Sequence, residues 1–266
     1  MSDAAAFFAK GWIRFGPDPV IAAWVRTAQP LAEALAADQD HRADWLRCGG
    51  TWFAGVNIFP NDATGAVAAR GVPPLAGAPI RFINDALGLT NIAWDRAQIS
   101  ICYPGYPQPW EGESEAAFRF RRDRDAAHVD GLTRIGDTRR RALGETHGFI
   151  LGLPLTETPP EAAPLVVWEG SHEIMRSAFR DRFGDIDPAE WQAEDVTDAY
   201  TAARRHVFET CPRVPIHASP GEAYLIHRLA LHGVAPWGQS AGEAARTIAY
   251  FRPELHGSPD YWLAAP

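Results

Sequence analysis

The sequence predicts a mainly β fold of the jelly-roll kind with a helical flank before it. From residue 97 onward, short apolar runs alternate with turns rich in Gly and Pro, which is typical of strands in a sandwich or barrel. Before that point the clearest apolar pattern has helical spacing, over residues 18–38. No stretch with the composition of a linker separates the two parts. We therefore expect one domain over residues 1–266, with a mostly helical flank (1–95) and a β core (96–255).

The flank contains one clearly marked helix, expected from Asp18 to about Asp38. Asp18 suits the N-cap, and Pro19 suits the first turn, where the missing N–H of proline has no partner to lose. Pro30 lies inside the segment and predicts a kink. The apolar residues at near-helical spacing are Val20, Ile21, Trp24, Leu31 and Leu35. Residues 57–79 are rich in Gly, Pro and Ala without a period, and predict a long irregular connection.

About seven strands are expected in the core. The clearest apolar runs are residues 97–103, 147–155, 164–168, 213–218, 223–229 and 245–251. Between the third and fourth runs, residues of about 173–210 are expected to form a helical insertion. Its start is marked by Asp187, Pro188 and Glu190, which have the order of an N-cap, a first-turn proline and the N3 glutamate of a capping box.

Composition and charge exclude several classes of protein. The chain has 25 Lys and Arg against 33 Asp and Glu, a net charge of −8, which disfavours nucleic acid and anionic membranes as partners. Cys48, Cys102 and Cys211 lie far apart, so neither a disulfide framework nor a zinc knuckle is expected. The sequence has neither a signal peptide nor a run of about 18 apolar residues, and we expect a soluble, unprocessed, cytoplasmic protein.

Two histidines and one aspartate are candidate metal ligands. His128 and Asp130 are two residues apart, so on a strand both side chains lie on one face and can bind one ion. Such a pair often arises by chance, but a second histidine, His227 or His232, lies in or just after the run at 223–229. Two His and one Asp form the facial triad that suits non-haem Fe(II), because three positions stay open for a bidentate co-substrate and O₂.

A candidate anion-binding residue follows the second histidine. Arg246 begins a strand fourteen residues after His232, and its rigid guanidinium suits the far carboxylate of a dicarboxylate. Arg246 shares strand parity with Ile248 and Tyr250. Arg252, the competing candidate, stands at the strand exit beside a proline, where a structural or exposed role is expected.

The sequence resembles the phytanoyl-CoA dioxygenase-like family of Fe(II)/2-oxoglutarate oxygenases over nearly the whole chain. Residues 8–13 look like the opening segment of that family, and His128 to Asp130 match its H-x-D motif. Residues 165–172 match the strand that leads into its P-G-S-H turn, and residues 221–236 match its G-D…H-x-x-x-P strand.

The match to the family pattern bears on the choice of the second histidine. Two residues five apart in one regular strand cannot share a face, so only one of His227 and His232 can join the site, and the resemblance implies His232. His227 is then a packed strand histidine, and His172 belongs to the structural turn. The sequence departs from the pattern at Glu169, where proline is usual, and at Trp237, where Asn is common.

The resemblance implies a double-stranded β-helix (jelly-roll, cupin-like) core. It also implies a dioxygenase that uses Fe(II), 2-oxoglutarate and O₂ to hydroxylate a small or carrier-linked organic substrate, with release of succinate and CO₂. His128, Asp130 and His232 are then the iron ligands, and Arg246 holds the 5-carboxylate of 2-oxoglutarate. Asp130 argues against the related halogenases, in which a small residue replaces the acidic ligand.

Two further residues are candidates for contact with 2-oxoglutarate. His147 has the parity of Phe149, Leu151 and Leu153, so its side chain is expected on the inward, apolar side. The alternative for His147 is a buried histidine bonded to the backbone. Gln98, on the strand before the H-x-D motif, is a similar case.

The nature of the substrate stays open. Eight arginines lie between residues 119 and 141, on both sides of the proposed ligands, against only four acids. They predict either a positive rim that favours an anionic substrate or a solvated loop that balances the acidic residues of 181–200. Trp110 and Trp168 are candidates for lining the cavity.

Two other functions remain as alternatives. A cupin-type isomerase or decarboxylase would keep the β core and the metal, but such enzymes usually have a close H-x-H pattern, which this sequence lacks. A binding module without iron is disfavoured because all the candidate ligands are retained. The oligomeric state is not predicted.

Overall fold

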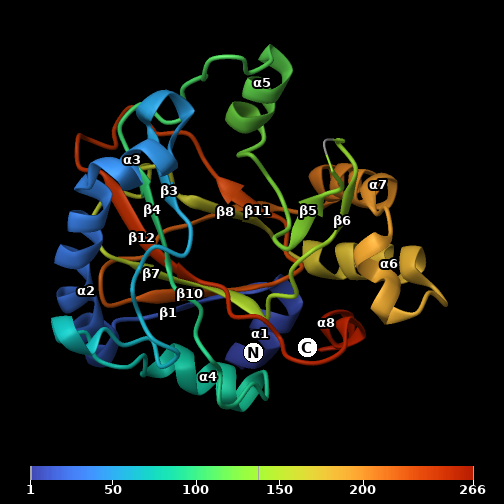
Figure 1. The fold of residues 1–266 in the computed structure, drawn as a ribbon, viewed down its shortest axis with the longest axis horizontal. Coiled ribbons are helices and arrows are strands. Elements are labelled where there is room, and N and C mark those ends of the chain that lie inside the picture. Colours follow the sequence, from blue (N-terminus) through green and yellow to red (C-terminus); the bar gives the residue numbers. More distant parts are fainter. Residues whose placement is uncertain (1, 137, 266) are drawn as a thin grey trace.

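The computed structural model describes residues 2–136 and 138–265 and contains two facing antiparallel sheets between layers of helices (Figure 1). The larger sheet consists, in spatial order, of β1 (Trp12–Phe15), β10 (Ala223–His227), β7 (Phe149–Pro154), β12 (Arg246–Phe251), β4 (Gln98–Cys102), β3 (Trp52–Gly55) and β2 (Leu46–Arg47). The smaller sheet consists of β11 (His232–Val234), β8 (Leu165–Trp168) and β9 (Arg213–Ile216). A separate hairpin pairs β5 (Leu132–Arg134) with β6 (Arg141–Leu143). The predicted jelly-roll core is confirmed, although the two sheets do not close into a barrel.

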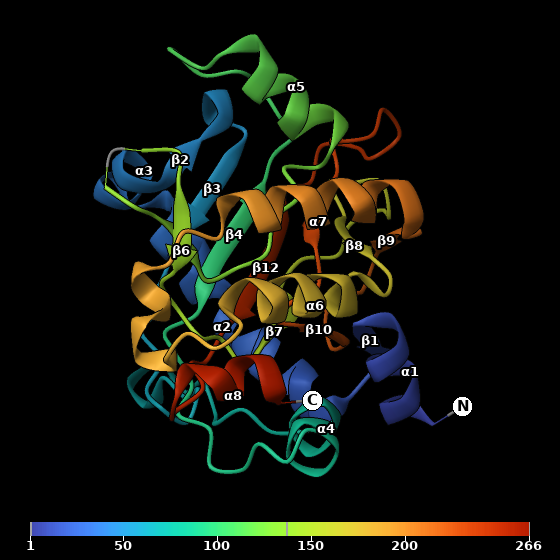
Figure 2. The same cartoon turned by 90° about the vertical axis from the view of Figure 1, so that its right-hand side faces the viewer.

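The structure also contains helices, some of which cover the outer faces of the two sheets. They are α1 (Asp3–Lys10), α2 (Pro19–Ala37), α3 (Gln39–Trp45), α4 (Ala78–Ala86), α5 (Glu115–Asp123), α6 (Ser171–Phe183), α7 (Thr197–Thr210) and α8 (Pro259–Ala264), with short 3-10 turns at Cys48–Gly50, Ala68–Arg70 and Pro188–Ala193. Figure 2 shows α6 and α7 lying side by side along one face of the molecule. Across the two described ranges, no helix combines the length and the apolarity that crossing a bilayer requires.

Alternation along the strands sorts the side chains into three layers. On the larger sheet, Leu151 and Phe251 face outward and pack with Trp24 of α2 in one buried cluster. The next residues along the strands, such as Ile150, face inward toward the smaller sheet. On the far side of the smaller sheet, Trp168 packs in a third cluster with residues of α6 and α7. The space between the sheets is therefore enclosed by two inner faces.

The predicted helix at Asp18 is confirmed as α2. One carboxylate oxygen of Asp18 accepts a hydrogen bond from the Val20 amide (2.8 Å), as an N-cap does. The other oxygen accepts from the Ala78 amide (2.7 Å), so the same side chain also holds the start of α4. The preceding helix α1 was not predicted, because eight residues are too few to establish a helical period.

The expected start of the helical insertion needs correction. Asp187 accepts a hydrogen bond from the Ala189 amide, but it begins only the 3-10 turn Pro188–Ala193. The main helices of the insertion are α6 and α7, whose N-caps, Gly170 and Val196, make no side-chain capping bond. Without capping side chains, the sequence has little signal for where these two helices begin.

The expectation that His227 and His232 lie in one strand is wrong. Strand β10 ends at His227, and residues 228–231 turn so that β11 begins at His232 in the opposite sheet. The Ala230 amide donates to the His227 carbonyl (2.8 Å) within this turn. The two histidines therefore belong to different sheets, and strand parity does not relate them.

Replacement of Asp18 by Ala is expected to lower the free energy of unfolding by about 2 kcal/mol or more, because it removes two caps worth roughly 1 kcal/mol each. Asp38→Ala is the matched control, since Asp38 caps only the exposed α3 through the His41 amide (3.0 Å). Its expected loss is about 1 kcal/mol. Urea unfolding followed by circular dichroism measures both, and equal losses would contradict the double role of Asp18.

Candidate metal centre

The three predicted ligands converge at one point between the sheets. One ligand atom each of His128, Asp130 and His232 lies within 4.8 Å of the others. Oδ1 of Asp130 lies 3.1 Å from Nε2 of His128 and 3.7 Å from Nε2 of His232. Asp130 and His232 are largely buried, whereas the His128 side chain is about half exposed (49%).

Backbone pairing brings the two histidines together. The His128 amide donates to the His232 carbonyl (2.8 Å), and the His232 amide donates back to the His128 carbonyl (3.0 Å). Gly233 allows this approach, since a Cβ at that position would lie 2.1 Å from the carbonyl oxygen of Asp125. The role of Gly233 was not recognised from the sequence, because it depends on a segment more than one hundred residues away.

The histidine rings are oriented by backbone carbonyls. Nδ1 of His128 lies 2.9 Å from the Ala126 carbonyl, and Nδ1 of His232 lies 3.0 Å from the Ala230 carbonyl. Because a carbonyl oxygen only accepts, both Nδ1 atoms carry the proton in these bonds. In the neutral rings each Nε2 is then a lone pair that faces the Asp130 carboxylate oxygen. Three acceptors that face one another need a proton or a cation between them, and this donor set fits a divalent metal ion.

The surroundings of Asp130 and His232 favour the unprotonated forms that bind a metal. Burial raises the pKa of Asp130, but the His128 hydrogen bond and the charges of His232 and Arg252 hold it well below its ordinary value. Burial lowers the pKa of His232 to about 4. Desolvation also lowers the pKa of His128, but the hydrogen bond and charge of Asp130 outweigh it and raise the pKa. Of the three ligands, His128 is therefore the one on which a proton competes with a metal up to the highest pH.

A cavity of about 210 Å³ adjoins the three ligands. It is lined by Trp52, Ala54, Val56, Gln98, Ser100, His128, Asp130, Ile150, Leu165, His232, Gly233, Val234, Tyr250 and Arg252. Gln98 lies on this wall, and its contact with 2-oxoglutarate stays a prediction. Trp110 and Trp168 do not line the cavity: Trp110 is exposed beside Arg121, and Trp168 packs on Phe208 outside the inner space. The lining tryptophan is Trp52 of β3, a strand within residues 1–95, where a mostly helical flank is expected.

Arg246 lies buried at the start of β12, outside the residues that line the cavity. It is 5% exposed, and among the described residues no carboxylate pairs with it. Its Nε is buried without a hydrogen-bond partner, and its Nη2 lies 3.6 Å from Sγ of Cys102. Burial lowers the pKa of Arg246, but the neighbouring Cys102, Tyr250 and Tyr224 raise it, so the guanidinium stays charged.

Two tyrosines separate Arg246 from the open cavity. The Tyr224 hydroxyl donates to the Tyr250 hydroxyl (2.9 Å), and Tyr250 itself lines the cavity. Gly152 lies opposite both residues in the sheet, and a Cβ there would lie 2.1 Å from the Tyr224 ring. A glycine at this position therefore makes room for the tyrosine pair beside Arg246.

Arg252 lies in the site rather than at an exposed strand exit, which corrects the sequence expectation. Its Nη1 lies 3.3 Å from Oδ2 of Asp130, and its side chain is only 18% exposed. Arg252 follows directly after β12, and its side chain lines the cavity on the inner side of the sheet.

His147 does not line the cavity, and its predicted contact with 2-oxoglutarate is not supported. It forms an isolated bridge with Glu254 before β7 begins, so the strand parity used for the prediction does not apply to it. Its Nδ1 lies 2.9 Å from the Arg252 carbonyl and its Nε2 lies 3.0 Å from Oε2 of Glu145. This is the alternative of a buried histidine bonded to the backbone.

The other two histidines considered from the sequence lie elsewhere. His227 lies with Nε2 2.8 Å from Nη2 of Arg176, packed between the larger sheet and α6. His172 is in the first turn of α6, where Nε2 lies 2.9 Å from the Phe8 carbonyl. Their rings lie 4.8 Å apart, away from the triad.

The arginine-rich segment 119–141 does not form a positive rim on the cavity. Arg121 pairs with Glu113, and Arg140 pairs with Asp195 at the insertion. Within the described ranges, no arginine of this segment lines the cavity. Asp137, one of the four acids of the segment, lies outside the described residues.

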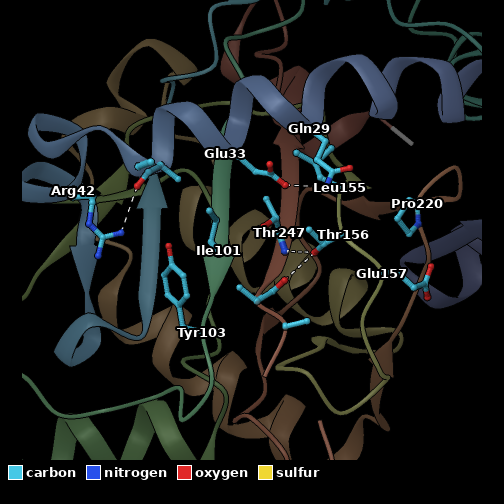
Figure 3. A pocket seen from close by; sticks show the side chains of 14 residues that line it. Gln29, Glu33, Arg42, Ile101, Tyr103, Leu155, Thr156, Glu157, Pro220 and Thr247 are labelled. Carbon is cyan, nitrogen blue, oxygen red and sulfur yellow. Dashed lines mark hydrogen bonds between the residues drawn. The ribbon is translucent and has the colours of Figure 1, made fainter. Parts of the chain in front are cut away.

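A larger hollow of about 720 Å³ lies on the outer face of the same sheet (Figure 3). Figure 3 shows α2 crossing above it, with the Glu33 carboxylate beside Gln29, which donates a hydrogen bond to it (2.9 Å), and with Ile101 of β4 on its floor. Ile101 and Thr247 alternate with the residues of β4 and β12 that line the inner cavity, so the two hollows lie on opposite sides of the sheet. The outer hollow contains none of the three candidate ligands.

The fold is similar to those of several solved structures, whereas no protein-family model and no curated protein matches the sequence. AviO1 from Streptomyces viridochromogenes Tue57 is 16% identical with a TM-score of 0.54, and the match covers 99% of this chain and 96% of that one. EvdMO1 is 15% identical with a TM-score of 0.52 over 96% of this chain, which spans half of EvdMO1. HygX from Streptomyces hygroscopicus, solved with nickel and 2-oxoglutarate bound, is 13% identical with a TM-score of 0.48 over 96% of this chain and 86% of HygX. The chain thus has the fold of AviO1 and EvdMO1.

Gly233→Ala is expected to weaken metal binding, because its Cβ would push residue 125 and the paired His128 segment away from β11. Overpacking of this kind costs about 1–3 kcal/mol of stability. Gly238→Ala is the matched control, since the new Cβ there would meet chiefly the Glu161 side chain, at 2.7 Å, outside the site. Calorimetric titration with Co(II) measures both variants, and unchanged affinity in Gly233→Ala would contradict the role of this glycine.

Metal affinity is expected to fall as the pH is lowered from about 8 to about 6, because a proton on His128 competes with the metal. The hydrogen bond and charge of Asp130 raise the pKa of His128, so the proton competes at a higher pH than for an ordinary histidine, while the lowered pKa keeps Asp130 ionised. Titrations in buffers of different ionisation enthalpy count the protons released on binding. Absence of both the proton release and the pH dependence would refute this assignment of protonation states.

Proposed function

We propose that the protein is an Fe(II)- and 2-oxoglutarate-dependent dioxygenase that hydroxylates a small organic substrate, with release of succinate and CO₂. The observation that carries the proposal is the meeting of Nε2 of His128, Nε2 of His232 and Oδ1 of Asp130 at one point beside a cavity. This donor set suits ferrous iron and leaves three positions open. When bound there, the iron would supply the oxidising chemistry with 2-oxoglutarate and O₂.

The unpaired charge of Arg246 supports 2-oxoglutarate as the co-substrate. A buried guanidinium without an anion is unfavourable, and a carboxylate beside it would satisfy both its charge and its unpartnered Nε. Arg246 and Arg252 face the same side of β12 and are six residues, about 20 Å, apart along the strand. Arg252 marks the end with the ligands. Tyr250 lies on the cavity wall between the two arginines, and a dicarboxylate bound at the ligands would direct its far carboxylate along β12 toward the Arg246 guanidinium.

The walls of the cavity indicate the kind of substrate. Apolar side chains, such as Val56, Ile150 and Leu165, make up much of the lining, and they limit the access of water to the buried Asp130 and His232. Gln98 and Ser100 are the polar groups of β4 on the same wall. A small, largely apolar molecule with a few hydrogen-bonding groups fits this lining. The other interpretation, in which arginines of 119–141 form a positive rim for an anionic substrate, has no support from these lining residues.

We propose that residues 1–266 form a single functional domain. Strand β1 of the N-terminal part pairs with β10, and β3 pairs with β4 and contributes Trp52 and Ala54 to the cavity. Removal of the N-terminal part would therefore remove a wall of the site. Free cysteines at Cys48, Cys102 and Cys211 support a reducing, cytoplasmic location.

Anaerobic titration with Fe(II) and 2-oxoglutarate tests the proposal. A visible metal-to-ligand charge-transfer band requires both molecules at one centre, so we expect the band in the wild-type protein. A cupin-type isomerase or decarboxylase would bind the metal without the band, and an iron-free binding module would give neither signal. Either of those results would overturn the proposal in favour of the corresponding alternative.

Two variants separate the roles within the site. Asp130→Ala is expected to abolish the band and substrate-coupled succinate formation, because it removes a ligand. Arg246→Ala is expected to keep metal binding and to raise the Kd for 2-oxoglutarate at least tenfold, since it removes the charge that pairs with the far carboxylate. Unchanged 2-oxoglutarate affinity in Arg246→Ala would discredit the assignment of that residue.

A further inference from the structure

We propose that Arg252 is a positioning residue that makes Asp130 a one-oxygen ligand and so keeps one coordination position open for the co-substrate. The inference rests on the proposed function, because it concerns the same metal site. It assigns a role to a side chain that neither binds the metal nor needs to touch the far end of the co-substrate.

The two carboxylate oxygens of Asp130 have different partners. Oδ1 faces both histidines, at 3.1 Å from Nε2 of His128 and 3.7 Å from Nε2 of His232. Oδ2 faces Nη1 of Arg252, at 3.3 Å. One oxygen is therefore directed to the point where the three ligands meet, and the other is directed to the guanidinium.

The backbone of Arg252 is held on both sides, which fixes where its side chain starts. Its amide donates to Oδ1 of Asp95 (2.8 Å), and its carbonyl accepts from Nδ1 of His147 (2.9 Å). Nε2 of His147 lies 3.0 Å from Oε2 of Glu145. These contacts involve only the main chain of residue 252, so a change of its side chain leaves them in place.

The need for such a residue follows from the chemistry of carboxylates. A carboxylate binds a metal through one oxygen or through two, and a second bond from Asp130 would fill one of the three positions that the facial triad leaves open. A bidentate co-substrate together with O₂ needs all three. A charge-assisted hydrogen bond to Oδ2 competes with that second metal bond. Arginine suits the task because its guanidinium stays charged throughout the physiological pH range.

The change in metal affinity distinguishes this role from that of a residue that only orients a ligand. Removal of such a partner typically lowers metal affinity ten- to a hundred-fold. Here, loss of the guanidinium frees Oδ2 to bind the metal and removes a positive charge near it. We therefore expect the metal affinity to be kept, while the affinity for 2-oxoglutarate falls.

The test uses the full chain with Mn(II) as the probe and three variants: Arg252→Met, Arg252→Lys and, as the control, Arg246→Met. Electron–nuclear double resonance with ¹⁷O-labelled water counts the exchangeable waters on bound Mn(II), without any turnover. We expect three waters in the wild type and the Arg246→Met control, two in Arg252→Met, and three again in Arg252→Lys, whose ammonium can donate to Oδ2. The 2-oxoglutarate Kd should rise about tenfold or more in Arg252→Met, with the Mn(II) Kd within about threefold of the wild type.

The outcomes separate the two proposals. Three waters in Arg252→Met, or a parallel loss of Mn(II) affinity in both Arg252 variants, overturns the positioning role while leaving the metal site intact. If the wild type binds no Mn(II) at the three ligands, the proposed function fails, and the role of Arg252 fails with it. If Arg252→Met does not fold, the same measurements on Arg252→Gln replace it, with two waters expected because the shorter amide cannot reach Oδ2.

Discussion

The structure depends on one pair of backbone hydrogen bonds, by which the residues around His128 and His232 lie against each other. These two segments are separated by more than one hundred residues, and nothing local brings their side chains together. The pair forms only because Gly233 has no Cβ to meet the carbonyl of Asp125. Once it has formed, the rings are oriented by their own carbonyls, and Asp130 follows two residues later.

The layered packing determines what this pair can do. The larger sheet is covered on its outer face by α2, and the smaller sheet is covered by α6 and α7, so both inner faces are shielded from solvent. The low-dielectric space between them strengthens the interactions of the charges placed inside. Asp130 and Arg252 neutralise each other at one end of β12, whereas Arg246 at the other end has no anion among the described residues. The unbalanced positive charge of Arg246 indicates that an anionic molecule binds beside it.

Much of this arrangement was accessible from the sequence, because it depends on local patterns. All six apolar runs contain strands, and the alternation that separates inner from outer residues was visible within each run. The three candidate ligands are brought together as the spacing indicated. What remained hidden depends on contacts between distant segments. The break between β10 and β11 is a change of sheet within an apolar run, and the position of Arg252 depends on where Asp130 lies in space. Parity failed for His147 because the strand starts two residues later.

The most direct test of the central claim is anomalous diffraction from crystals soaked with Co(II). The account predicts one strong peak within about 2.0–2.2 Å of Nε2 of His128, Nε2 of His232 and Oδ1 of Asp130, the range of metal bonds to imidazole and carboxylate. It also predicts that Oδ2 of Asp130 stays on Arg252 and outside bonding distance of the metal. A peak elsewhere in the molecule, or no peak at these three atoms, would contradict the account.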